Sequence, residues 1–232
     1  MPIPPYLKRD AIDIDTKKYQ TIFAKKDGSV AAPTAGLHFT SSILNELKLK
    51  KIKTTELTLH VGAGTFEPIK NNCIKHHDMH QEFFSFTIES LESIYTNLGN
   101  IIAIGTTSVR GLESIYHIGR KILQKEENPL EIAQWEIYSN TKITNKEAIR
   151  ALIKYMKNNR INNCTASTKM LILPGYKFKI INGMLTNFHL PKSTLLLLVS
   201  AWVGDSWKEI YQSAKNNNFR FLSYGDTSLL FR

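Results

Sequence analysis

The chain has 232 residues, of which 42% are hydrophobic and 22% are charged. This composition supports one sizeable core and argues against a disordered protein. Cys73 and Cys164 are isolated, which argues against a disulfide scaffold or a zinc ribbon and indicates a reducing compartment. We see no signal peptide and no apolar run of the ~20 residues that span a bilayer, so we expect a cytoplasmic protein without a membrane segment.

The balance of charge is strongly basic. Thirty Lys and Arg residues stand against 20 Asp and Glu residues, a formal net charge of +10. Such a charge fits an RNA-binding face, because phosphate contacts provide most non-specific affinity for nucleic acid. It equally fits a lysine-rich surface without a specific partner, and composition alone does not separate the two.

Strand and helix patterns alternate from residue 31 to the C-terminus. We expect helices over 41–50, 88–97, 108–123, 145–157, 194–203 and 206–216. We expect strands over 55–61, 100–105, 168–173, 176–181, 183–188 and 219–223. Capping boxes are predicted at Thr144-x-x-Glu147 and Ser206-x-x-Glu209, and Ser193 or Thr194 should cap the helix at 194–203.

This alternation predicts the α/β class and a mostly parallel sheet. We expect a single domain over 1–232. The stretch near 124–167 is less regular and is interpreted as an insertion, with Trp135 as its anchor.

Polar side chains and glycines gather where the predicted strands end. They are Thr34 and His38 in a small-residue turn, Gly62 and Gly64 after 55–61, Thr106, Thr107, Ser108 and Arg110 after 100–105, and Asn187, Phe188 and His189 at the end of 183–188. Strand ends and helix N-termini direct hydrogen-bonding groups into one crevice. We therefore expect His38, His80, Arg110 and His189 to converge on one cleft.

The densest titratable cluster is His77-x-x-His80-x-Glu82. Helical spacing would bring the two imidazoles together. The interpretations, in order of preference, are acid–base or ligand-binding groups, a structural polar network, and a zinc site.

Other candidate site residues have both a functional and a structural interpretation. Thr107 or Ser108 could simply cap the helix, and Arg110 could pair with Glu113 one turn on instead of clamping an anion. Asp226, after Tyr224, could hold ribose hydroxyls or serve as a turn residue. Three basic residues could face phosphate or solvent: Lys177, Lys179 and Arg220.

Taken in order, these segments resemble one family, together with Pro2-Ile3-Pro4-Pro5-Tyr6 and the run from Phe219 to Asp226. It is the S-adenosylmethionine:tRNA ribosyltransferase-isomerase family of queuosine biosynthesis, and the resemblance covers nearly the whole chain. In that family the segment similar to 2–6 lies well inside the protein. The resemblance therefore implies the C-terminal portion of a barrel-like, mostly parallel α/β catalytic domain, incomplete at its N-terminus. It also implies that the family's small inserted β-barrel is absent.

The resemblance also implies a reaction. S-adenosylmethionine, a co-substrate, would give its ribosyl carbons to the aminomethyl group of a 7-deazaguanine in tRNA. Epoxyqueuosine would form, and adenine and methionine would leave. No metal and no true cofactor are implied. The residues expected to act as catalytic groups are His77, His80, Glu82 and His189. Those expected to bind substrate are Thr34, His38, Gly62, Gly64, Thr106, Thr107, Ser108, Arg110, Asn187, Phe188, Tyr224 and Asp226.

Two alternatives remain open from the sequence. The chain could be an inactive tRNA-binding remnant, or a subunit of a split enzyme with a partner that supplies the missing N-terminal region. Without the resemblance, a barrel-like hydrolase or isomerase using His77, His80 and Glu82 would also fit.

Overall fold

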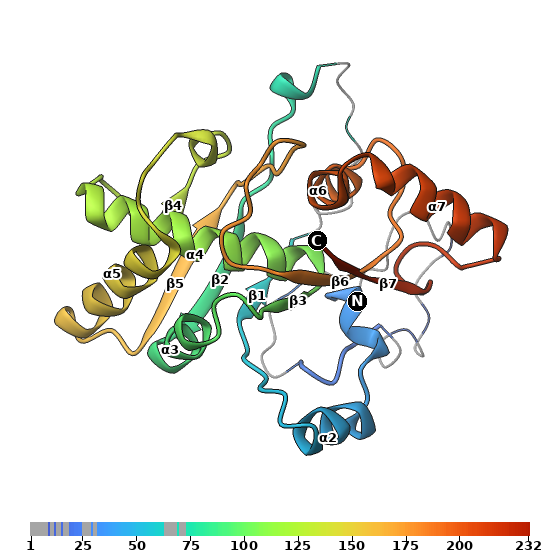
Figure 1. The fold of residues 1–232 in the computed structure, drawn as a ribbon, viewed down its shortest axis with the longest axis horizontal. Coiled ribbons are helices and arrows are strands. Elements are labelled where there is room, and N and C mark those ends of the chain that lie inside the picture. Colours follow the sequence, from blue (N-terminus) through green and yellow to red (C-terminus); the bar gives the residue numbers. More distant parts are fainter. Residues whose placement is uncertain are drawn as a thin grey trace.

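The computed structural model describes residues 9, 12, 15, 19–24, 29, 32–62, 69 and 73–232, and within them two sheets share a central helix (Figure 1). The four-stranded sheet has the order β1 (Thr58–His60), β2 (Glu82–Thr87), β5 (Asn163–Thr168), β4 (Glu131–Ile132). The three-stranded sheet has the order β3 (Ile102–Ile104), β6 (Gly183–Asn187), β7 (Thr227–Phe231). The predicted α/β class is confirmed.

The strand directions correct the expectation of a mostly parallel sheet. β3 pairs with β6 and β4 with β5 in parallel, but β2 pairs antiparallel with both β1 and β5, and β7 pairs antiparallel with β6. Alternating strands and helices form parallel pairs only when each helix carries the chain back to the end of the sheet at which the preceding strand began. Here β7 follows α7 and returns against β6 instead. The strands of the described residues form no closed barrel.

Helix α4 (Thr106–Gln124) is the centre of the molecule. It begins after Gly105, whose φ of 88° favours glycine because a side chain there would be strained. Ile115, Tyr116 and Ile118 are fully buried. At Gly119 an added Cβ would overlap the Ala148 carbonyl, so this glycine lets α4 and α5 (Asn145–Asn158) cross closely.

The remaining helices agree with the sequence pattern. They are α2 (Ser41–Leu49), α3 (Ile88–Thr96), α6 (Thr194–Val203) and α7 (Trp207–Asn216). Ser193 caps α6 by accepting from the Leu196 N–H, as predicted, and the Thr144 capping box is present. The capping box predicted at Ser206 is wrong. Ser206 ends a 3-10 turn with helical backbone angles, and its side chain makes no capping hydrogen bond. No helix within the described ranges is long and apolar enough to cross a membrane.

Three predicted strands are misplaced. The strand expected at 168–173 lies at 163–168, and the one expected at 219–223 lies at 227–231. No strand forms over 176–181. The backbone N–H groups of Lys179, Ile180 and Ile181 instead donate to the buried Glu113 carboxylate at 2.7–3.1 Å. The Tyr176 hydroxyl donates to the same carboxylate at 3.0 Å, so a side chain on α4 replaces the neighbouring strand that this segment would need.

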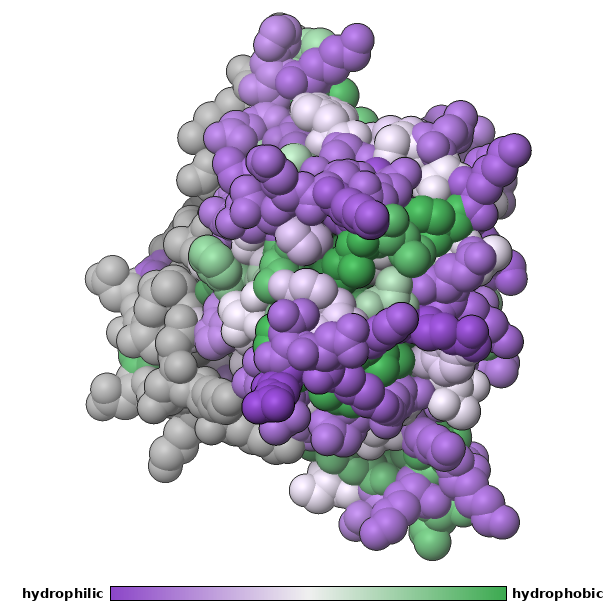
Figure 2. Space-filling model, turned by 90° about the vertical axis from the view of Figure 1, so that its left-hand side faces the viewer, coloured by the Kyte–Doolittle hydropathy of each residue, from purple (hydrophilic) through white to green (hydrophobic). Residues whose placement is uncertain are grey.

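The stretch near 124–167 contributes α5 and β5 to the core. Ile149, Leu152 and Met156 on α5 are fully buried. Trp135, the expected anchor, is 40% exposed, and that expectation is wrong; apolar α5 residues hold the segment instead. Figure 2 shows the face on the α5 side, where hydrophilic residues dominate and apolar ones gather in a smaller central area.

We predict that Glu113→Ala lowers the free energy of unfolding by about 3 kcal/mol or more, because it leaves four donors in the interior without an acceptor. Urea unfolding followed by circular dichroism measures the change. Glu127→Ala, at an exposed position just after α4, should stay within about 0.5 kcal/mol of the wild type. Equal losses in both variants would contradict the role assigned to Glu113.

Candidate functional site

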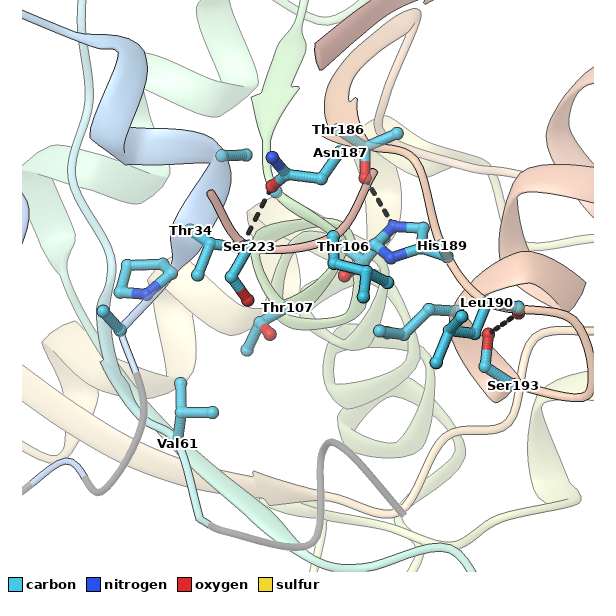
Figure 3. A pocket seen from close by; sticks show the side chains of 16 residues that line it. Thr34, Val61, Thr106, Thr107, Thr186, Asn187, His189, Leu190, Ser193 and Ser223 are labelled. Atoms are coloured by element: carbon cyan, nitrogen blue, oxygen red, sulfur yellow. Dashed lines mark hydrogen bonds between the residues drawn. The ribbon is translucent and has the colours of Figure 1, made fainter. Parts of the chain in front are cut away.

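A small cavity of about 80 Å³ lies where strand ends meet the start of helices (Figure 3). Its walls come from six places: the 3-10 helix Thr34–His38 with the residues before it, the end of β1, the start of α4, the end of β6 with the loop after it, the start of α6, and residues 222–223. The polar side chains on these walls are Thr34, Thr106, Thr107, Thr186, Asn187, His189, Ser193 and Ser223. The cavity thus lies at the ends of β1, β3 and β6, where the sequence led us to expect polar groups to gather.

Thr34 and Asn187 close one side of the cavity. The Thr34 hydroxyl donates to the Asn187 Oδ1 at 3.0 Å, which joins the 3-10 helix to the end of β6 (Figure 3). Asn187 Nδ2 in turn donates to the Gly225 carbonyl at 3.4 Å. His38 is exposed, and its Nε2 lies 3.1 Å from the same carbonyl. His38 thus supports the rim of the cavity, while Thr34 and Asn187 form its wall.

His189 is the titratable side chain on the cavity wall. Its Nε2 lies 2.8 Å from the Thr186 hydroxyl, and its backbone N–H donates to the Tyr211 hydroxyl at 3.0 Å. Burial lowers the pKa of His189 from 6.5 to about 4, since a charged imidazole would lose its hydration. At physiological pH the ring is therefore neutral and able to accept a proton.

The start of α4 forms another wall. Gly105, Thr106 and Thr107 line the cavity, and the first N–H groups of a helix have no partner within the helix, which favours an anion. The N-cap residue is Gly105, so neither Thr107 nor Ser108 caps the helix by its side chain. Ser108 faces a separate groove beside β3, which corrects its assignment to this site.

Glu82 carries a buried ion-pair cluster. Arg110 Nη1 and His80 Nε2 lie 3.0 Å and 2.9 Å from the same Glu82 Oε1. Arg110 follows Thr106 by four residues and so lies one helical turn below the cavity wall. The alternative pairing of Arg110 with Glu113 is wrong, because the Arg110 side chain is 3% exposed and faces Glu82. Its role in clamping an anion stays a prediction.

The helical spacing expected for His77 and His80 is not observed. Residues 77–81 form neither helix nor strand, and Glu82 begins β2. His77 contributes its backbone carbonyl, which accepts from Gln134 Nε2 at 2.7 Å. Among the described residues, no cluster of His, Cys, Asp or Glu side chains is suited to hold a metal ion. The convergence of His38, His80, Arg110 and His189 on one cleft stays a prediction. Of these four residues, His189 lines the cavity.

Three further candidates have structural partners. Phe188 is 3% exposed and packs in an aromatic cluster with Tyr211, 5.4 Å between ring centroids, which corrects its role as a stacking surface for a base. Asp226 accepts from the Arg220 N–H at 2.7 Å and pairs with its guanidinium at 3.0 Å, so it closes a turn. The Tyr224 hydroxyl donates to Asp15 at 3.5 Å.

Gly62 follows Val61 on the cavity wall, and Gly64 lies outside the described residues.

Two residues of the site had no sequence signal. Tyr211 lies mid-helix in α7, where the amphipathic pattern predicts only core packing, yet its hydroxyl holds the His189 backbone. Leu222 lines the cavity with a φ of 70°, and its N–H donates to the Phe188 carbonyl. Such a backbone conformation is rare outside glycine and cannot be read from a leucine.

The family profile described as "Queuosine biosynthesis protein" matches residues 1–230. The chain belongs to this family. It is 41% identical to the S-adenosylmethionine:tRNA ribosyltransferase-isomerase of Vesicomyosocius okutanii, over 99% of the chain and 57% of that relative. The Caldanaerobacter subterraneus protein of the same name is also 41% identical, with the same coverage of each.

A solved structure agrees with this assignment. The S-adenosylmethionine tRNA ribosyltransferase of Thermotoga maritima is 30% identical, with a TM-score of 0.53 over 84% of this chain and 50% of that one. The chain thus spans little more than half the length of these relatives.

We predict that the protein loses stability as the pH falls from about 6.5 toward 4. The folded-state pKa of His189 lies below its ordinary value, so the unfolded chain binds this proton at a higher pH than the folded chain does. The free energy of unfolding therefore decreases as the pH falls. His117, whose pKa burial lowers to about 3, acts in the same direction, at up to ~1.4 kcal/mol per pH unit for each group. Urea unfolding at a series of pH values measures the slope.

His189→Asn provides the comparison, because it removes one of the two groups and should flatten the slope between pH 6 and 4. The raised pKa of Glu113 opposes the trend in both proteins and cancels in the difference. An unchanged slope in His189→Asn would show that this ring titrates alike in the folded and unfolded chain.

Proposed function

We propose that this chain provides part of the active site of an S-adenosylmethionine:tRNA ribosyltransferase-isomerase. The substrates would be S-adenosylmethionine and a tRNA that carries 7-aminomethyl-7-deazaguanine, and the products epoxyqueuosine in tRNA, adenine and methionine. The observation that carries the proposal is a neutral histidine on the wall of a strand-end cavity, in a chain whose family profile matches residues 1–230.

The wall residues suit the steps of this reaction. His189 is uncharged, so it can take the proton that an adjacent sulfonium makes acidic. A charged imidazole would instead repel the sulfonium. The free N–H groups at Thr106 and Thr107 suit the methionine carboxylate. Thr34 and Asn187 offer a hydroxyl and an amide that can hydrogen-bond ribose hydroxyls.

The Glu82 cluster lies behind this wall. Glu82 neutralises the buried Arg110, and His80 is partly exposed and shares the same carboxylate oxygen. We assign His80 to proton transfer with the departing adenine, because its imidazole is partly exposed and is oriented by the Glu82 carboxylate at 2.9 Å.

The cavity is too small to hold both substrates. Its volume of about 80 Å³ compares with roughly 300–1,000 Å³ for typical ligand sites. We therefore propose that the family's remaining length completes the site, either in the same polypeptide or as a partner. The alternative is a tRNA-binding remnant without catalysis, which the intact Thr34–Asn187 and Thr186–His189 pairs make less favourable.

We predict little or no epoxyqueuosine formation by these 232 residues alone, and activity when they are joined to the unmatched portion of a relative such as the Vesicomyosocius okutanii protein. Catalytic groups require positions held to within ~0.5 Å, which an incomplete site does not provide. Mass spectrometry of the digested tRNA detects the product.

In the completed enzyme, His189→Asn should abolish turnover with tRNA affinity unchanged, because the residue is assigned to proton transfer. Asn keeps a polar side chain of similar reach toward Thr186, so a folding defect is less expected than with Ala. Turnover at the wild-type rate by His189→Asn would refute the assignment of the base.

We predict that tRNA binding weakens steeply with salt, with log K falling linearly against log salt concentration. The formal charge of +10 supports this, and Lys177 is exposed and free to meet a phosphate. Lys177→Ala should weaken binding to any RNA and reduce the salt slope by about one unit. Filter binding from dilute to physiological salt measures both.

Lys177→Arg is the matched control and should keep the slope, since it keeps the charge. Lys179 and Arg220 are poorer choices: the Lys179 ammonium lies 5.1 Å from the centre of the Tyr116 ring, and Arg220 pairs with Asp226. Affinity that is independent of salt would mean that the positive charge serves another purpose.

A further inference from the structure

A groove of about 390 Å³ runs along the outer side of β3, separate from the cavity at the strand ends. Its floor is apolar and includes Ile94 and Leu112, both more than nine-tenths buried. Its far wall is the segment 51–57, which forms neither helix nor strand and in which residues 51–56 are all exposed. The groove therefore combines a buried apolar floor with an exposed wall.

The open side of the groove is a sheet edge. β3 is the end strand of its sheet and bonds to β6 through the Ile101 carbonyl and the Gly105 N–H. In a parallel pair, alternate residues turn their backbone groups toward the partner strand. The N–H and C=O groups of Ile102 and Ile104 therefore point away from β6 and into the groove.

This edge lacks the usual protection against pairing. Natural edge strands carry charges, prolines or bulges that block another strand. β3 and its neighbours read Ile101-Ile102-Ala103-Ile104, and Ile102 is 48% exposed. Among the residues that the structure describes, no strand pairs with this side of β3.

We propose that the groove receives a β-strand from the part of the family's length that this chain does not span, and that this strand extends the three-stranded sheet at β3. The proposal rests on the family assignment and on the proposed completion of the site. Relatives are covered over only 57% of their length, so the family contains enough further chain to supply such a strand. Lys51 and Lys53 on the groove wall favour a strand with acidic flanks.

The test uses the full 232-residue chain co-expressed with the unmatched portion of the Vesicomyosocius okutanii relative, with an affinity tag on the chain. Ile102→Lys places a charge on the apolar edge and should reduce the co-purified portion at least tenfold. Leu229→Lys is the matched control: Leu229 is 52% exposed and lies on β7, the opposite edge strand of the same sheet. It should change co-purification less than twofold.

A second measurement does not depend on how the variants fold. Hydrogen exchange of the wild-type chain, alone and in the co-purified complex, should show protection of the Ile102 and Ile104 amides on binding. Unchanged exchange at both amides, equal effects of the two lysine variants, or a chain that dimerises through β3 would overturn the proposal. A complex that depends on Ile102 but makes no epoxyqueuosine would leave the groove proposal standing and refute the proposed function.

Discussion

Helix α4 is buried between the two sheets, and its position determines three other parts of the molecule. Its first residues form a wall of the cavity, and its second turn carries Arg110 against Glu82 on β2. Its middle carries Glu113, which holds the loop at 179–181. One rigid helix thus fixes the site, the first sheet and the connection into β6 together. A shift of α4 would disturb all three, which is why Gly119 must allow the close crossing with α5.

Burying charge on this helix is costly, and the structure offsets the cost by local pairing. Desolvation lowers the pKa of Arg110 and raises that of Glu113. Arg110 retains its charge beside Glu82, whereas Glu113 is stabilised by four donors. Removing one partner from either cluster would leave a buried charge or buried hydrogen-bond donors without a partner. The interior of the molecule therefore specifies one arrangement of α4 more strongly than apolar packing alone would.

The sequence predicted the parts of the fold that are governed by local signals. The Ser193 cap and the Thr144 capping box depend on residues within one turn, and both are present. The segment 176–181 has a strand-like pattern, but its N–H groups bond to Glu113, which is more than 60 residues away. β2 was not predicted, and the spacing of the two histidines before it was considered as helical. Non-local hydrogen bonds decided both cases, and spacing along the chain does not show them.

The cavity likewise depends on both local and non-local features. The ends of β3 and β6 do meet at the cavity, because parallel neighbours place their carboxyl ends together. Which side chain faces the cavity was harder to predict. Phe188 and His189 are adjacent, and the chain turns one into the aromatic cluster and the other onto the cavity wall. The aromatic residues that pack against Phe188 come from α7 and the loop after it, so the sequence around Phe188 does not indicate this contact.

The start of α4 also connects the cavity and the groove. Thr106 and Thr107 face the cavity, while Ser108 and Leu112 face the groove. Successive helical residues point about 100° apart, so the two surfaces are two sides of the same first turns. A strand added at β3 would brace Ile104 and Gly105, which position the N-terminus of α4. Completion of the sheet would therefore also hold the start of α4, and with it one wall of the cavity, more rigidly.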